Sequence, residues 1–215
     1  MAARKPSDED LKAAVLEAAL GHAPSDGFSD AVLARSAKDA GVSAEMLLHL
    51  FPDGPAGLVE CFSEASDAQM ERRLAKQSLS EMKIRARIAA AVLARLAAIE
   101  PHKEAARRAS AFLMLPTNAA RGLKLLYRTV DAMWRAAGDT STDFNFYTKR
   151  AILAGVYSAT LLRWFNDTSE DESETRAFLD ARIENVMQFE KFKAELRERT
   201  KDWPSFADIV NARRR

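Results

Sequence analysis

Apolar side chains recur at three- and four-residue steps along most of this chain, and this spacing constrains the fold more than any other feature. The clearest run is Ile84, Ile88, Val92, Leu96 and Ile99. Such steps place side chains on one face of an α-helix, whereas a half-buried strand alternates apolar and polar residues. That alternation is absent, and the 215 residues include only eight glycines. The sequence therefore predicts an all-α fold.

Breaks between these runs divide the chain into three parts. We expect residues 1–54 to form a three-helix unit of the helix-turn-helix type, residues 55–200 a larger helical bundle, and residues 201–215 an amphipathic basic tail. The expected helices cover about 8–22, 29–40, 44–50, 55–78, 81–100, 103–115, 117–137, 143–166 and 174–200, with a short helix from 205. Ser43 is expected to cap the third of these, because serine favours the position before a helix.

The composition is that of a soluble globular protein, with 47% apolar and 29% charged residues and a net charge of +1. The single cysteine, Cys61, excludes an internal disulfide and favours a reducing compartment. The first residues lack the hydrophobic core of a secretion signal, and no apolar run reaches the roughly 18 residues of a spanning helix. These features predict a cytoplasmic protein.

The opening segment resembles the DNA-binding end of TetR-type regulators at three places: Gly27-Phe28, Ala40 to Ser43 and Leu50 to Pro52. In those regulators the third helix enters the major groove and carries polar readers. Here residues 44–51 offer one acid and several aliphatic side chains, and residues 28–60 carry two basic against five acidic residues. Phosphate contacts supply most non-specific affinity for DNA, so this unit is expected to bind no nucleic acid. A ligand-responsive TetR-type repressor remains the alternative function.

A polar corner follows the helix expected to end near Ala137. Gly138 suits the left-handed conformation that often ends a helix. Side-chain oxygens for capping belong to Asp139, Ser141, Thr142 and Asp143, and the aromatic residues that follow are Phe144, Phe146 and Tyr147. At least one of these rings should be exposed and form a contact surface.

This corner also carries a family resemblance. Together with Leu113 to Asn118 upstream and Arg150 to Ala154 downstream, it is similar to the Coq-nine family of accessory lipid-binding proteins in ubiquinone biosynthesis. The resemblance implies a TetR-like fold, a homodimer, and a non-catalytic protein that binds isoprenoid quinone intermediates and assists a membrane-bound di-iron hydroxylase. It also implies a peripheral location on the inner face of the cell membrane, or on the matrix side of a mitochondrion.

Apolar residues between 110 and 165 are candidates for an isoprenoid or phospholipid pocket, because methionine adapts to irregular ligands and small residues between the bulky ones leave space. The candidates are Phe112, Leu113, Met114, Leu115, Leu126, Trp134, Ile152, Val156, Tyr157, Leu161 and Trp164. The same residues would also serve as an ordinary bundle core, and the family resemblance is what favours the pocket.

The resemblance further implies a docking surface for the hydroxylase beside the corner. Its positions in this chain are Asp131, Met133, Phe146, Tyr147 and Arg150. The family more often has tryptophan where this chain has Phe146, so the apolar anchor is kept and an indole N–H is lost.

The tail combines an apolar stripe with basic charge. The residues expected to contact a membrane are Trp203, Phe206, Ile209, Val210 and Arg213, and residues 189–215 hold eight basic against five acidic side chains. Aromatic and basic residues on a short amphipathic helix suit a membrane interface. Folding of this helix back onto the bundle is the other possibility.

Catalytic patterns are missing from the sequence. The three histidines stand far apart, and there is no Glu-x-x-His pair, zinc-ligand spacing, phosphate-binding glycine loop or nucleophile elbow. We therefore expect no catalytic residues, no metal and no cofactor.

Overall fold

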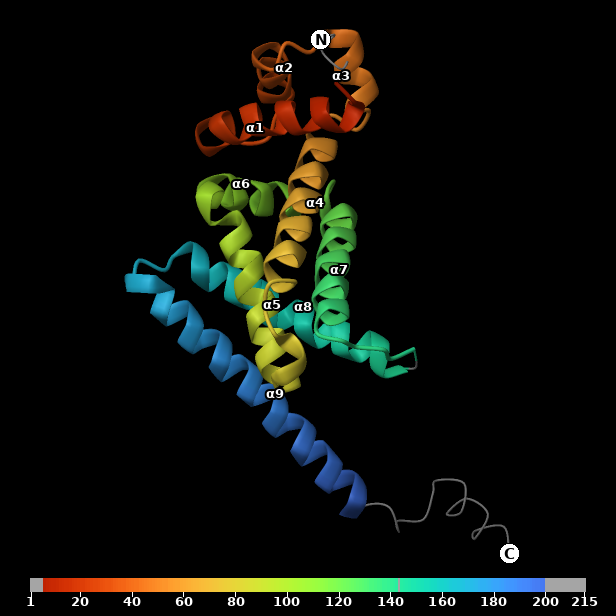
Figure 1. Ribbon diagram of the computed structural model, residues 1–215, viewed down its shortest axis with the longest axis vertical. Helices are drawn as coiled ribbons and strands as arrows, with labels where there is room; N and C mark the ends of the chain where they lie inside the picture. The colour runs from red at the N-terminus through yellow and green to blue at the C-terminus, as the bar shows by residue number, and fades with distance from the viewer. Residues whose placement is uncertain (1–5, 143, 200–215) are drawn as a thin grey trace, which may run out of the picture.

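The structure, a computed structural model, describes residues 6–142 and 144–199 (Figure 1). Helices and turns account for these residues, and no β-strand occurs among them, which confirms the all-α prediction. The helices are α1 (Asp8–Asp26), α2 (Asp30–Asp39), α3 (Ala44–Leu50), α4 (Pro55–Leu74), α5 (Ile84–Ile99), α6 (Lys103–Met114), α7 (Ala119–Ala136), α8 (Phe144–Phe165) and α9 (Ser173–Arg199). Short 3-10 turns cover Leu79–Glu81, Glu100–His102 and Glu170–Glu172.

Helices α1, α2 and α3 pack together at one end of the molecule (Figure 1). Each begins after a serine whose hydroxyl accepts a hydrogen bond from a backbone N–H three residues later, namely Ser7, Ser29 and Ser43. These bonds satisfy donors that a helix start leaves unpaired. The predicted cap at Ser43 is confirmed.

Four helix ends differ from the prediction by two residues or more, and one is the start of α5 at Ile84, because a 3-10 turn ends at Glu81 where the expected helix begins. Helix α1 continues past residue 22 to Asp26 although Pro24 removes one of its backbone hydrogen bonds, and Gly27 then ends the helix with φ +69°. Helix α4 ends at residue 74, before residue 78, since the chain tightens and the N–H of Gln77 bonds to the carbonyl of Leu74. Helix α7 begins only after Asn118.

Helix α4 runs from the N-terminal unit into the larger domain, where it lies against α5 and α7 (Figure 1). Ion pairs reinforce the α4–α7 contact. Arg121 of α7 bonds to Asp53 at 2.8 Å and to Glu60 at 2.9 Å, and Arg128 bonds to Glu64. Acidic residues of the N-terminal unit and of α4 are thus paired with basic residues of α7.

Helix α9 packs on α8 and α5 with its first half and then extends away from the other helices (Figure 1). Leu179 is fully buried and Ile183 is half-buried, whereas the Phe189 side chain is 61% exposed. None of the described helices is both long and apolar enough to cross a membrane. The five predicted membrane-contacting residues (Trp203, Phe206, Ile209, Val210 and Arg213) lie outside the described residues.

Candidate functional site

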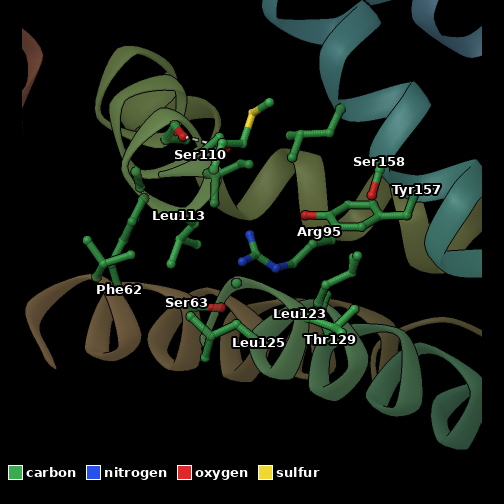
Figure 2. A pocket seen from close by; sticks show the side chains of 18 of the residues that line it. Phe62, Ser63, Arg95, Ser110, Leu113, Leu123, Leu125, Thr129, Tyr157 and Ser158 are labelled. Carbon is green, nitrogen blue, oxygen red and sulfur yellow. Dashed lines mark hydrogen bonds between the residues drawn. The ribbon is translucent and has the colours of Figure 1, made fainter. Parts of the chain in front are cut away.

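A cavity of about 450 Å³ lies between α4, α6, α7 and α8, with α5 at its floor (Figure 2). This volume is within the range of roughly 300–1,000 Å³ that ligand sites occupy. Most of the lining is apolar. Met114, Leu123 and Leu162 line it while being 75%, 69% and 56% exposed, so the cavity opens to the surface at these side chains.

The structure divides the eleven predicted lipid-binding residues into three groups. The five that line this main cavity are Leu113, Met114, Leu126, Tyr157 and Leu161. A second cavity of about 100 Å³ between α5, α7, α8 and α9 is lined by Trp134, Ile152 and Val156. Those outside both are Phe112, which packs half-buried against the core, Leu115, which is exposed, and Trp164, which is fully buried. Contact of any of them with lipid stays a prediction.

A glycine sets the distance between α6 and α7 at the edge of the main cavity. A Cβ atom at Gly122 would lie 3.1 Å from the carbonyl oxygen of Leu113, which is tighter than nine in ten real Cβ contacts. The absence of a side chain therefore lets the two helices meet beside the mouth.

A polar group at the floor of the main cavity was not foreseen from the sequence. Nε of Arg95 donates to Oδ1 of Asp67 at 2.7 Å, and the hydroxyl of Thr129 lies 3.0 Å from both oxygens of that carboxylate. The Arg95 residue is only 6% exposed, and its Nη1 atom has no hydrogen-bond partner within the described part of the chain. The guanidinium and the phenol of Tyr157 both point into the cavity (Figure 2).

A signal for this group was present in the sequence. Arg95 lies three residues after Val92 and four before Ile99, which places an arginine on the apolar stripe of its helix. Asp67 lies three residues before Met70 on the buried side of α4. An acid and a base on the inner faces of consecutive helices predict a buried pair.

The corner between α7 and α8 has the predicted helix end. Gly138 has φ +86°, its N–H bonds to the carbonyl of Arg135, and the N–H of Asp139 bonds to the carbonyl of Trp134. This pair of bonds is a Schellman motif. The prediction that Gly138 ends the helix is confirmed.

Ion pairs connect this corner to the first turns of α8. Arg150 bonds to Asp131 at 2.6 Å and to Asp139 at 3.1 Å, and Lys149 bonds to Asp139 at 2.7 Å. Burial raises the pKa of the Asp139 carboxyl, but hydrogen bonds from Lys149, Ser141 and Arg150 outweigh it and lower the pKa to about 2. We expected Asp139 to cap a helix; the contacts described for its carboxylate are with these three side chains instead. Asp143, the other expected cap, lies outside the described residues.

The five predicted docking positions differ in accessibility. Tyr147 is 65% exposed, and Phe146 and Asp131 are half-buried. Met133 and Arg150 are buried, because Met133 faces the core and Arg150 is enclosed by its carboxylates and by the ring of Phe146, 3.4 Å from its guanidinium carbon. Arg150 therefore holds the Phe146 ring in place and presents no surface of its own. Binding of a partner here stays a prediction.

No three His, Cys, Asp or Glu side chains come together to hold a metal ion in residues 6–142 and 144–199. Cys61 is half-buried, and burial raises the pKa of its thiol. A further buried carboxylate, that of Asp167, accepts hydrogen bonds from Ser169 and Thr175, which lower its pKa.

Residues 119–190 match the COQ9 family model. This range includes the corner and the parts of α7 and α8 that line the main cavity. The resemblance to that family is confirmed. Relatives named "Ubiquinone biosynthesis protein COQ9, mitochondrial" are 36% identical over 196 residues in Rattus norvegicus and 35% over 196 residues in Homo sapiens, and a COQ9-B protein of Xenopus laevis is 38% identical over 188 residues. Each match covers 84% of this chain and 60%, 59% and 64% of the respective relative. The chain thus spans about 60% of the length of the curated COQ9 relatives it matches.

Solved structures resemble this chain over more than four fifths of its length, well beyond residues 119–190. A TetR transcriptional regulator from Nitrosomonas europaea aligns with a TM-score of 0.67 at 19% identity, covering 83% of this chain and 98% of that one. A putative TetR-family regulator from Shewanella aligns with a TM-score of 0.52 at 23% identity, covering 82% and 97%. At such identities the likeness concerns the fold alone, and it confirms the predicted TetR-like fold.

Proposed function

We propose that this chain is a non-catalytic accessory protein of ubiquinone biosynthesis, which binds an isoprenoid quinone intermediate in the main cavity and presents it to a di-iron hydroxylase. The observation that carries the proposal is an open, mainly apolar cavity of ligand size in a chain similar to COQ9 proteins. Burial of an isoprenoid tail is favourable by about 0.8 kcal/mol per methylene and needs no charged partner. The family resemblance adds a homodimer as the working form.

The alternative, a repressor, has the TetR-like fold in its favour. The surface of α3 supports the accessory role instead. Its exposed side chains include Glu45, Leu48 and His49, and His49 lies 3.1 Å from the carboxylate of Asp8. A helix with this acidic and aliphatic face offers no lysine or arginine to a DNA phosphate.

The docking surface for the hydroxylase is proposed at Phe146 and Tyr147. Their rings meet edge to face at 5.2 Å between centroids, and Arg150 stacks beneath Phe146. An exposed ring (Tyr147) beside a half-buried one (Phe146) on a rigid support favours protein contacts, because little side-chain freedom is lost on binding.

Membrane association is proposed for the tail and for the end of α9. Met187 and Phe189 are exposed where α9 leaves the other helices, and the basic, aromatic tail follows. A basic residue near an anionic bilayer contributes about 1 kcal/mol of attraction.

The cavity proposal is tested with decylubiquinone, a short-chain quinone, and the full-length protein. The purified protein is titrated, and binding is followed as a rise in melting temperature. Ala109→Phe places a ring inside the cavity and should weaken binding by about tenfold or more, since the ring occupies ligand space. Ala111→Phe makes the same change on the exposed side of α6 and should bind like the wild type. Equal binding by both variants, or none by the wild type, would refute the proposal.

The docking proposal is tested by Tyr147→Glu in a pull-down with the hydroxylase. The introduced charge should disrupt an apolar contact, so the variant should retain much less hydroxylase than the wild type does. Tyr127→Glu, on the exposed side of α7, is the matched control and should retain it. Unchanged retention by Tyr147→Glu contradicts this surface.

A further inference from the structure

The floor of the main cavity holds one hydrogen-bond donor that the fold leaves unused. Arg95 is 94% enclosed, its Nε is fixed by Asp67, and its Nη1 finds no acceptor in the part of the chain that the structure describes. A buried donor without an acceptor destabilises the fold, and more so when it is charged. Such a donor calls for a physical explanation, and an acceptor on a bound molecule is one that the adjacent cavity has room for.

We propose that the cavity binds its ligand head inward, with an uncharged carbonyl or hydroxyl oxygen of the head group accepting from Arg95 and meeting the hydroxyl of Tyr157, and with the apolar tail leaving past Met114 and Leu123. This inference rests on the proposed function, and it adds the orientation of the ligand and the chemistry of its head.

The orientation follows from where the polar atoms lie. Arg95, Thr129 and Tyr157 are buried, whereas the side chains exposed at the mouth of the cavity (Met114, Leu123 and Leu162) are apolar. A head group with oxygen acceptors gains hydrogen bonds at the floor that the mouth does not offer. The apolar tail of the ligand gains contact with the apolar side chains of the remaining cavity wall.

The absence of charge on the head group follows from Asp67. Its carboxylate is bonded to Arg95 at 2.7 Å, so the pair has no net charge. An anionic head such as a phosphate would be attracted by the guanidinium and repelled by the adjacent carboxylate in a low-dielectric site. A quinone or phenol oxygen uses the same donor without that repulsion. The phenol of Tyr157 fits this role, because burial raises its pKa and keeps it protonated as a second donor.

A head group that binds at the cavity floor also lies toward the corner, where we propose that the enzyme docks. Thr129, which bonds to Asp67, precedes Asp131 of the corner by two residues on α7. The polar end of the cavity is therefore the end nearest the proposed docking surface along this helix.

The test compares three probes with the full-length protein: decylubiquinone, decylbenzene, which lacks the oxygens, and dodecyl phosphate, which is anionic. Arg95→Lys keeps a charge beside Asp67 and removes the guanidinium donor, and Tyr157→Phe removes only a hydroxyl. Loss of a hydrogen bond to a charged donor should weaken decylubiquinone binding about tenfold or more in Arg95→Lys, and loss of a neutral one about two- to tenfold in Tyr157→Phe. Decylbenzene should bind all proteins equally.

Arg128→Lys is the matched control. Arg128 also has a buried Nη2 atom without a partner among the described residues, but it pairs with Glu64 and does not line the cavity. It should leave decylubiquinone binding unchanged.

The outcomes separate the inference from the proposed function. If the wild type binds no probe, the proposed function itself fails. Wild-type binding of decylubiquinone that neither Arg95→Lys nor Tyr157→Phe weakens overturns the inward head and leaves the proposed function standing. Tighter binding of dodecyl phosphate than of decylubiquinone, lost in Arg95→Lys, overturns the uncharged head. Should Arg95→Lys fail to fold, Tyr157→Phe with decylubiquinone and decylbenzene decides the question.

Discussion

Two arginines are buried to nearly the same degree in this protein, and their surroundings are opposite. Arg150 at the corner bonds to Asp131, to Asp139 and to the carbonyl of Phe146, and its flat face lies on a ring. Arg95 at the cavity floor has Asp67 as its partner and one Nη1 atom without any in the described chain. The fold supplies acceptors to both Nε and Nη1 of Arg150, which suits a structural role, whereas Nη1 of Arg95 is left for a ligand.

The difference shows that burial alone does not indicate the role of a charged residue. What separates the two sites is the number of hydrogen-bonding atoms that the fold satisfies and the kind of space around the rest. The Arg150 guanidinium lies against two carboxylates and a ring, whereas the Arg95 guanidinium borders a cavity of about 450 Å³.

The largest effect on stability is expected from Arg150→Met. It leaves two carboxylates close together without their shared cation, and breaking a buried pair is destabilising by about 3–5 kcal/mol. Urea unfolding measures the change. Arg135→Met removes an exposed partner of Asp131 at 3.5 Å and should change the free energy of unfolding by about 0.5 kcal/mol or less. If Arg150→Met is as stable as Arg135→Met, the ion pairs of Arg150 do not stabilise the fold.

Arg95→Met should also be destabilising, by about 3 kcal/mol, because it leaves Asp67 buried and unpaired. Asp67→Asn combined with Arg95→Met removes both charges while an amide remains to bond Thr129. This double variant should recover most of the lost stability, since the unpaired charge is gone. If the double variant is less stable than Arg95→Met, the lost stability comes from the missing ion pair and not from the unpaired charge of Asp67.

The stability that the ion pairs of the corner contribute should depend on pH. Because the pKa of Asp139 is lowered to about 2 in the folded state from 3.8, its contribution to stability is complete above about pH 4 and is lost as the pH falls from about 4 to about 2. Wild-type stability should therefore fall more steeply over this window than that of Asp139→Asn. Urea midpoints at several pH values measure both slopes, with the exposed carboxylate variant Asp180→Asn as control. Parallel slopes for wild type and Asp139→Asn would contradict the ionic cluster.

The smallest effect is expected from Tyr157→Phe without ligand. The phenol forms no hydrogen bond with the described residues, so the free energy of unfolding should change by about 0.5 kcal/mol or less. Urea unfolding of the ligand-free protein checks this. A loss above 1 kcal/mol would reveal a structural partner for the hydroxyl and weaken its assignment to a ligand.

The sequence predicted the helices well because their signals are local. Ser43, Gly41 and Gly138 fix helix ends through their own backbone and side-chain bonds, and the expected helix 44–50 occurs with the same bounds. Proline was a weaker guide, since α1 passes through Pro24.

The candidate site was only partly predictable, because tertiary packing decides which helix face meets a neighbour. Leu113 and Tyr157 do line the cavity, while Trp164, chosen by the same apolar criterion, lies in the core. The interaction of Arg95 with Asp67 joins residues 28 positions apart, and spacing within one helix does not define it. Burial of Met133 and Arg150 likewise depends on how α8 crosses α7.

Helix α4 belongs to two parts of the molecule at once. Its first turns pack against α1 and α2, and farther along it supplies Phe62 and the carboxylate of Asp67 at the cavity. Because one helix contacts both parts, we expect a tilt of α4 on filling of the cavity to change the angle of the N-terminal unit as well. A fluorescent label on α3 would therefore act as a remote gauge of cavity occupancy.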